Sequence, residues 1–153
     1  MDKITPQLLK ILKDRIMLLK GPMGTMIQAY KLNEEQYSGT QFKDHSMEQK
    51  GNNDLLNITQ PEIIAEIHRK YLEAGCDIIE TNTFNSTSIS MADYGMEDQV
   101  FNIAYAGTQI SRKLADEYTQ KNPSKPRFVV GILGPTNRTL SISPDVNDPG
   151  FRN

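Results

Sequence analysis

The segment Asp77-Ile78-Ile79-Glu80-Thr81-Asn82-Thr83-Phe84 joins an apolar half to a polar half without an intervening turn. Its first residues have the pattern of a buried strand, because aliphatic side chains pack well between layers of helices. Its last residues carry carboxyl, hydroxyl and amide groups. In parallel α/β folds the functional site lies at this carboxyl end of the strands. The segment therefore predicts an α/β protein with polar site residues at the strand end.

A predicted helix precedes this strand, and the sequence marks both of its ends. Thr59 and Glu62 have the spacing of a capping box. Pro61 suits the first turn, and Gly75 supplies a left-handed stop. Apolar side chains recur with the helical period, which predicts one buried face. That face comprises Ile63, Ile64, Ile67, Tyr71 and Leu72.

Helix and strand patterns alternate along the rest of the chain. Short apolar runs predict strands over 16–19, 77–83 and 127–135. Amphipathic runs predict further helices over 6–15, from about 24 to 30, and from about 96 to 119. This alternation predicts a parallel sheet with right-handed crossovers.

Composition limits the classes of function. The 153 residues carry a net charge of -2, with acidic and basic residues mixed along the chain. That distribution argues against a nucleic-acid or anionic-membrane surface. No apolar run approaches the roughly 20 residues of a transmembrane helix, and the amino terminus lacks a signal-peptide pattern. Cys76 is the single cysteine, so no internal disulfide can form and a reducing cytoplasm is the expected compartment.

Two segments are candidates for a small-molecule site. Lys20-Gly21-Pro22-Met23-Gly24-Thr25 follows the first predicted strand, and its glycines would let a ligand approach the backbone. It matches neither a Walker A loop nor a dinucleotide fingerprint, and without further context a simple turn is the favoured interpretation. Glu80-Thr81-Asn82-Thr83 is either a solvated strand end or part of a site. A site is favoured because polar groups in a central strand need partners.

The remaining reactive side chains have simpler interpretations. His45 and His68 are each predicted to be surface residues, because neither has metal-ligating neighbours at a suitable spacing. Cys76 is predicted to be a small buried residue with no nucleophilic role. The polar, aperiodic stretch 32–57 predicts a long loop, and loops of that length are functional or disordered.

Six motifs follow one another along nearly the whole chain. They are Gly21-Pro22-Met23-Gly24-Thr25-Met26-Ile27-Gln28, Lys50-Gly51-Asn52-Asn53-Asp54-Leu55-Leu56, Glu80-Thr81-Asn82-Thr83-Phe84-Asn85-Ser86-Thr87, Met91-Ala92-Asp93-Tyr94, Gly134-Pro135-Thr136-Asn137-Arg138-Thr139, and Ser141-Ile142-Ser143-Pro144-Asp145-Val146-Asn147-Asp148-Pro149. Together they resemble the amino-terminal homocysteine-binding domain of cobalamin-dependent methionine synthase. The segment with Thr81-Asn82-Thr83-Phe84 is shared more widely with homocysteine S-methyltransferases.

The resemblance implies a (β/α)8 TIM barrel of about twice this length, of which the chain would supply the N-terminal part with about three of eight parallel strands. Residues 1–153 would then be a partial homocysteine-binding domain, cut before the C-terminal half of the barrel. Such a fragment is expected to be unstable and inactive by itself. Its implied partners are homocysteine, the remaining barrel half, and the folate, cobalamin and activation domains of a parent protein.

In the family that the motifs resemble, zinc held by cysteine thiolates activates homocysteine, and methylcobalamin recharged from methyltetrahydrofolate donates the methyl group. The family's zinc cysteines have no counterpart here, so the chain is not expected to bind the catalytic zinc. The resemblance implies no catalytic residue in this chain. It implies that the homocysteine pocket is lined by Gly21, Met23, Gly24, Thr25, Glu80, Thr81, Asn82, Thr83 and Phe84.

Two residues depart from the family pattern near this pocket. Lys20 stands where the family usually has an acidic residue, and Pro22 stands where it usually has a small one. The acidic residue suits the substrate ammonium group. A lysine would repel that group unless its side chain turns away or pairs with Glu80.

Two alternatives remain open. One is a cobalamin-independent homocysteine S-methyltransferase that uses betaine or S-methylmethionine, which the sequence after Pro135 disfavours. The other is a non-catalytic half-barrel binding module that pairs with a second copy or with the missing half.

Overall fold

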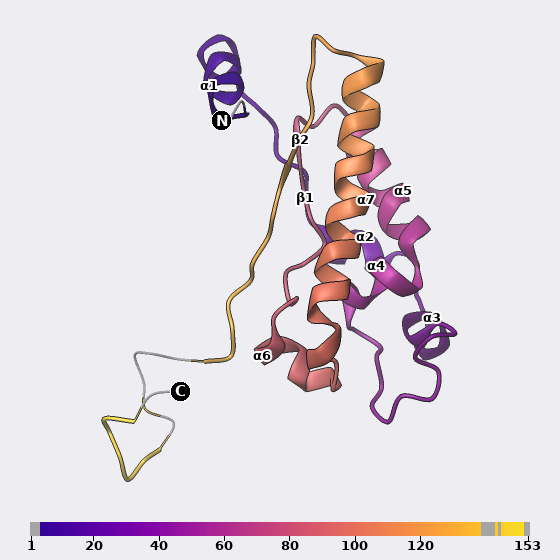
Figure 1. Ribbon diagram of the computed structural model, residues 1–153, viewed down its shortest axis with the longest axis vertical. Coiled ribbons are helices and arrows are strands. Elements are labelled where there is room, and N and C mark those ends of the chain that lie inside the picture. The colour runs from indigo at the N-terminus through magenta and orange to yellow at the C-terminus, as the bar shows by residue number, and fades with distance from the viewer. Residues whose placement is uncertain (1–3, 139–142, 144, 152–153) are drawn as a thin grey trace.

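Helices cover one side of a short parallel sheet (Figure 1). The computed structural model describes residues 4–138, 143 and 145–151. The strands lie at the centre, the longer helices pack on one side of them, and the last described residues, drawn in yellow, lie apart from this body (Figure 1). The architecture is therefore part of a layered α/β fold.

The sheet contains β1, Ile78–Glu80, and β2, Phe128–Val130, which pair in parallel. On the other edge of β1, Leu19 forms an isolated parallel bridge to Ile78. Spatial order thus follows chain order, as expected for consecutive β-α units. The expectation of a third full strand is not confirmed, because the described residues before β1 contribute only this bridge to the sheet.

Both strands are shorter than predicted, because threonine hydroxyls replace ladder hydrogen bonds beyond Glu80. The Thr81 N–H donates to the Val130 carbonyl at 3.0 Å. The Ile132 N–H then donates to Thr81 Oγ1 at 3.1 Å, and Thr83 Oγ1 donates to the Ile132 carbonyl at 2.8 Å. The polar strand end is thus held to the segment after β2 by side chains.

Helices α5, Pro61–Glu73, and α7, Val100–Lys121, pack on one face of β1. The predicted buried face of α5 is confirmed, with three of its members buried and two partly buried. Ile79 lies in the core between these helices. The core members around it are Ala65, Leu72, Cys76, Leu114 and Ala115.

The structure tests the predicted cap residues at both ends of α5. The predicted capping box is wrong: Gln60 is the N-cap, and the Thr59 hydroxyl bonds to the Leu55 carbonyl at the end of α4, Leu56–Thr59. The predicted stop is confirmed, with Gly75 at a φ of 101°. There Cys76 N–H donates to Tyr71 O, and Gly75 N–H donates to Leu72 O, as in a Schellman motif.

The predicted long loop over 32–57 is partly helical. Asn33 and Gln36 form a capping box that starts α3, Glu34–Ser38. The 3-10 turn η1, Asn53–Leu55, leads directly into α4. The prediction missed these elements because each is shorter than the window in which a period can be recognised.

The other helices are mostly short. Before α7 lies the 3-10 turn Glu97–Gln99, and the predicted start near 96 falls at the residue that precedes this turn. The remaining elements are α1, Ile4–Asp14; α2, Met23–Gln28; α6, Ser88–Met91; and η2, Ala92–Tyr94.

An ion pair fixes the amino end of β1 to the end of α1. Arg15 donates two hydrogen bonds to the Asp77 carboxylate, at 2.9 and 2.7 Å. The Leu18 N–H donates to the same carboxylate at 2.9 Å. Burial by itself raises the pKa of Asp77, but these donors outweigh it and hold the pKa below its ordinary value.

The expectation of surface histidines is wrong for His68, which is fully buried between α5 and α7. His45 is partly buried, with Nε2 2.9 Å from the Tyr94 carbonyl. His68 was misjudged because its own helix neighbours are charged, whereas its side chain meets Ser111 of α7. Cys76 is buried, as predicted.

Among the described residues, no helix of the core clusters packs on the sheet face opposite α5 and α7, and only Phe128 is buried there. Ile79 and Val129 pack with the helices, so side chains one position away in register point to the other face. Leu19 is 52% exposed and Val130 is 40% exposed on that face. We refer to Leu19, Ile78 and Val130 as the open face.

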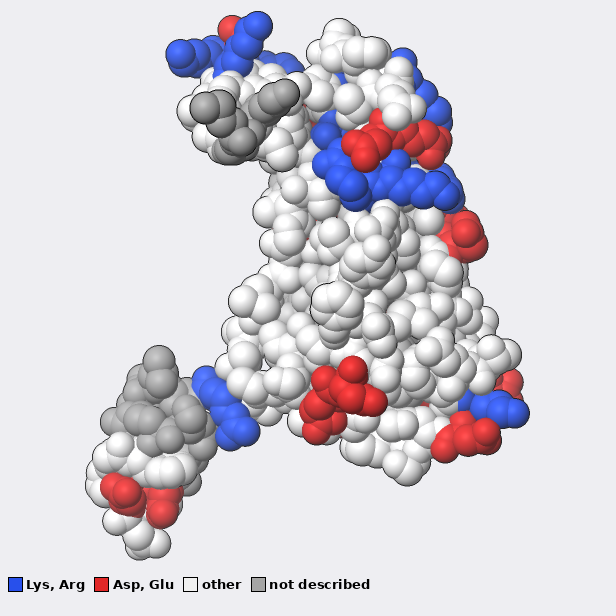
Figure 2. Space-filling view, viewed as in Figure 1, with Lys and Arg blue, Asp and Glu red and all other residues white. Residues whose placement is uncertain are grey.

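The face of the molecule drawn in Figure 2 is mostly uncharged across its middle, with blue and red atoms side by side near its upper end. Within the described part of the chain, no helix is long and apolar enough to span a bilayer.

Candidate functional site

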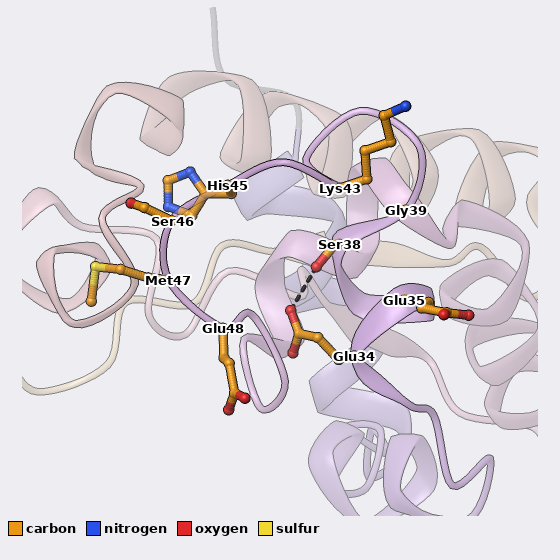
Figure 3. A pocket seen from close by; sticks show the side chains of 9 residues that line it. All are labelled: Glu34, Glu35, Ser38, Gly39, Lys43, His45, Ser46, Met47 and Glu48. Atoms are coloured by element: carbon orange, nitrogen blue, oxygen red, sulfur yellow. Dashed lines mark hydrogen bonds between the residues drawn. The ribbon is translucent and has the colours of Figure 1, made fainter.

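Two cavities among the described residues are compared as candidates for the site. The first, of about 250 Å³, lies under the segment between α3 and η1. We call it the loop cavity (Figure 3). Its lining comprises Glu34, Glu35, Ser38, Gly39, Lys43, His45, Ser46, Met47 and Glu48.

Glu34, an acidic residue of the loop cavity, forms hydrogen bonds that stabilise the surrounding loop. Glu34 accepts hydrogen bonds from the Ser38 hydroxyl at 2.6 Å, and from the backbone N–H groups of Gln49 and Lys50 at 2.7 Å each. Although burial opposes the effect, these donors keep the pKa of Glu34 low. The side chains of Glu35, Lys43 and Glu48 point in different directions (Figure 3). We therefore assign the loop cavity a structural role.

The second cavity, of about 360 Å³, lies where the carboxyl end of β1 meets the turn before α2. We call it the strand-end cavity. In parallel α/β proteins this is the edge at which ligands bind. Its lining comprises Lys20, Pro22, Met23, Gly24, Asn53, Asp54, Glu80, Thr81, Asn82, Phe84, Asn85 and Ile132.

Lys20 enters this cavity as half of an ion pair. Its Nζ lies 3.2 Å from Glu80 Oε2 and also donates to the Gly21 carbonyl at 3.2 Å. The Lys20 side chain is only 2% exposed. Burial lowers the pKa of its ammonium group, and the attraction of Glu80 opposes that shift. The pairing with Glu80, one of the two expected ways to remove repulsion, is therefore present.

Asp54 is the second carboxylate of the strand-end cavity, and it is 2% exposed. Its Oδ2 accepts hydrogen bonds from the Asn85 N–H at 2.7 Å and from the Ser86 hydroxyl at 2.8 Å. Burial raises the pKa of Asp54 to about 6, against the effect of these donors. Within the described residues no Lys, Arg or His forms an ion pair with it.

Asparagine side chains fix the wall of the cavity. Asn82 Nδ2 donates to the Asn53 carbonyl at 2.8 Å and to Asn57 Oδ1 at 3.1 Å. Asn57 Nδ2 donates to the Asn82 carbonyl at 2.7 Å. The Tyr37 hydroxyl donates to Asn53 Oδ1 at 2.9 Å, and Asn53 Nδ2 faces Gly24. Asn82 Nδ2 therefore donates its hydrogen bonds within the protein, whereas Asn53 lines the cavity with its Nδ2 close to Gly24.

The structure distributes the predicted pocket residues over two groups. Gly21 packs against Tyr71 of α5, and Thr25 lies exposed on α2. Thr83 is buried, with its hydroxyl 2.6 Å from that of Thr81. These three lie outside the lining of the strand-end cavity. The predicted residues within the lining are Met23, Gly24, Glu80, Thr81, Asn82 and Phe84.

Sequence reasoning did not propose Asn53, Asp54, Asn85 or Ile132 as site residues, although they line the cavity. Asn53 and Asp54 fall in the stretch predicted as loop. The available signal was the run Asn52-Asn53-Asp54 directly before Leu55-Leu56, where polar groups are held next to buried ones. The contact with β1 depends on tertiary packing and has no local signal.

The donor atoms of the strand-end cavity do not fit the thiolate zinc site that the resemblance implies. Its lining offers carboxylates, amides, a hydroxyl and an ammonium group. Cys76 precedes β1, at the opposite end of the strand, and burial raises the pKa of its thiol. Among residues 4–138, 143 and 145–151, no group of three His, Cys, Asp or Glu side chains is placed to hold a metal ion.

Comparisons with known proteins identify relatives of this chain. The family model of homocysteine S-methyltransferase matches residues 17–152. Two structures of the homocysteine methyltransferase MmuM from Escherichia coli are similar to it. The metallated form has 23% identity and a TM-score of 0.61 over 82% of this chain. The oxidized form has 25% identity and a TM-score of 0.62 over 83%. The chain spans 40% of the length of each.

Proposed function

Because the chain belongs to the homocysteine S-methyltransferase family, we propose that its strand-end cavity binds homocysteine as part of a methionine synthase. The observation that carries this proposal is the convergence of an ammonium group, two carboxylates and free amide groups at the carboxyl end of β1. A zwitterionic amino acid requires partners of both charges and polar donors. Residues 1–153 would be a partial homocysteine-binding domain with a cytoplasmic location.

The proposed reaction transfers a methyl group from methylcobalamin, recharged by 5-methyltetrahydrofolate, to the sulfur of homocysteine, which gives methionine. Zinc, when bound by the complete enzyme, lowers the pKa of the homocysteine thiol. The strand-end cavity does not fit that metal, so we assign zinc and cobalamin to other parts of a parent protein. The chain itself binds and orients the substrate and is inactive alone.

The cavity has an apolar side and a polar side on which the substrate can be oriented. Met23, Phe84 and Ile132 offer contacts for the methylene groups and the sulfur atom. Asn53 Nδ2, held by Tyr37 through Oδ1, offers a donor for the substrate carboxylate. Asn82 acts as a brace for this wall, because its amide hydrogens bond to Asn53 and Asn57.

Nuclear magnetic resonance titration of the isotope-labelled chain with L-homocysteine tests the binding proposal. We expect backbone amide shifts to cluster at the strand-end cavity, with Gly24, Asn53 and Asn85 among the most affected. The loop cavity is the internal control, and Gly39 should not move. Shifts confined to the loop cavity, or none at millimolar homocysteine, would contradict the proposal.

An assay with different methyl donors tests the cobalamin-independent alternative. The sequence after Pro135, which disfavours this alternative, lies partly outside the described residues, at 139–142 and 144. We expect the chain with zinc and homocysteine to form no methionine from methylcobalamin, betaine or S-methylmethionine. Methionine formed from betaine or S-methylmethionine would favour the alternative.

The open face also suits the half-barrel module, because Leu19 and Val130 lack a covering layer among the described residues.

A further inference from the structure

We propose that Asp54 recognises the ammonium group of the substrate and makes the strand-end cavity selective for amino acids over thiols that lack the amino group. This inference rests on the proposed function and adds the residue that determines its specificity. It assigns ammonium recognition to η1, whereas the family pattern places the acidic residue for that group at the position of Lys20.

The charged side chains that line the strand-end cavity are not balanced. Its lining contains one cation, Lys20, and two carboxylates, Glu80 and Asp54. Lys20 lies 3.2 Å from Glu80, so these two charges neutralise each other. Asp54 is left as the one carboxylate of the lining without a cationic partner among the described residues. A buried carboxylate without a counter-ion is costly, and a ligand cation would remove that cost.

Hydrogen bonds hold the Asp54 carboxylate in a fixed position. Asn85 N–H and the Ser86 hydroxyl both bond to Oδ2, at 2.7 and 2.8 Å, and the Ser86 backbone N–H is a further donor to the carboxylate. These contacts anchor the carboxylate to the segment after β1, while Asp54 still lines the strand-end cavity. The side chain is 2% exposed, so a ligand group bound there would be shielded from water. Shielding strengthens an interaction between ammonium and carboxylate.

A donor for the other end of the ligand lies next to Asp54. Asn53 is adjacent to Asp54 in η1 and lines the same cavity, with its Nδ2 close to Gly24. An α-amino acid carries its ammonium and carboxylate groups on one carbon atom. Neighbouring residues with an acceptor and a donor match this arrangement.

The charge of Asp54 adds a pH dependence that the test can use. Its pKa is about 6, so the carboxylate is ionised at neutral pH and becomes protonated as the pH falls below 6. The charged or titratable groups near it are Lys20 and Glu80 in the cavity and Tyr94 of η2. Affinity for a ligand with an ammonium group should therefore fall below pH 6, whereas affinity for the same thiol without that group should not.

The experiment compares L-homocysteine with 4-sulfanylbutanoate, which lacks only the amino group, by titration of the wild-type chain and of Asp54→Asn. We expect Asp54→Asn to weaken homocysteine binding by about 10- to 100-fold, the range for a hydrogen bond to a charged group. Binding of 4-sulfanylbutanoate should change by less than about threefold. Glu35→Gln, an exposed carboxylate of the loop cavity, is the matched control and should bind as the wild type does.

Other outcomes separate the two proposals. If the wild type binds both ligands equally, the role of Asp54 is refuted while the binding function stands. If it binds neither, the proposed function fails as well. If Asp54→Asn does not fold, the wild-type titrations from pH 7.5 to 5 decide. A homocysteine affinity that stays constant over that range would overturn the proposal.

Discussion

Lys20 and His68 are two buried side chains that can carry a positive charge. Lys20 pairs with Glu80 at 3.2 Å, and the attraction of that carboxylate opposes the lowering of its pKa by burial. His68 of α5 instead contacts the Ser111 hydroxyl at 3.3 Å, and its Nδ1 has no hydrogen-bond partner among the described residues. Burial and repulsion from Lys20 lower the pKa of His68 to about 4. The two side chains thus differ in that a carboxylate partner supports the charge of Lys20 alone.

His68 makes the fold sensitive to acid. The unfolded chain binds a proton near pH 6.5, but folded His68 does so only near pH 4. Stability is therefore fully present above pH 6.5 and decreases as the pH falls, by up to about 3 kcal/mol. Asp54, with its pKa raised to about 6, acts in the opposite sense over a similar range. The wild type should show a shallow dependence as a result.

We expect His68→Gln to remove the destabilising contribution between pH 6.5 and 4.5, so that the variant loses less stability on acidification than the wild type. Thermal unfolding followed by circular dichroism at several pH values measures this. His45→Gln is the matched control and should keep the wild-type dependence. A His68→Gln variant with the same pH dependence as the wild type would show that His68 does not couple folding to protonation.

At the scale of the elements, local sequence predicted the main helices and strands, and contacts between elements changed their ends. The stripe on α5 and the stop at Gly75 depend on neighbours within one helical turn, so both were predictable. The end of β1 was not, because it depends on hydroxyl contacts from Thr81 and Thr83 to a segment about fifty residues later.

Gly107 shows how a contact between elements overrides helix propensity. It lies in the middle of α7, where alanine would favour the helix by about 1 kcal/mol. A Cβ atom there would lie 2.5 Å from Asn57 Nδ2. Asn57 cannot easily move, because the same atom donates to the carbonyls of Asn82 and Ile103 at 2.7 and 3.2 Å.

We expect Gly107→Ala to lower the free energy of unfolding by about 1–3 kcal/mol, because the clash at a buried hydrogen-bonded amide exceeds the gain in propensity. Urea denaturation measures the change. Thr108→Ala, at the adjacent exposed position, is the matched control and should stay within about 0.5 kcal/mol of the wild type. A stabilised Gly107→Ala variant would mean that propensity prevails and that the contact is readily relieved.

At the scale of the whole molecule, the described helices α5 and α7 pack on one face of the sheet and leave much of the other face exposed. The helices pack on the face that contains Ile79 and Val129, and the open face presents Leu19 and Val130 to solvent. Apolar strand surfaces with unpaired edges favour association with further strands. The chain should therefore self-associate when no other polypeptide covers this face.

Sedimentation velocity over a range of concentrations tests this expectation. Leu19→Glu places a charge on the open face and should shift the chain toward monomer. Phe101→Glu alters an equally apolar side chain, 76% exposed on α7, and should leave the association unchanged. Monomeric wild type at all concentrations, or an equal effect of both substitutions, would refute a role for the open face.

The sequence by itself determined the alternation of the two longest helices with two parallel strands, and the family, because these follow from periodicity and motifs within short segments. Only the tertiary structure decided the burial of His68, the pairing of Lys20 with Glu80 and the place of Asp54 in the strand-end cavity. The reason is physical: burial and charge pairing depend on atoms brought together from segments that lie far apart in the chain.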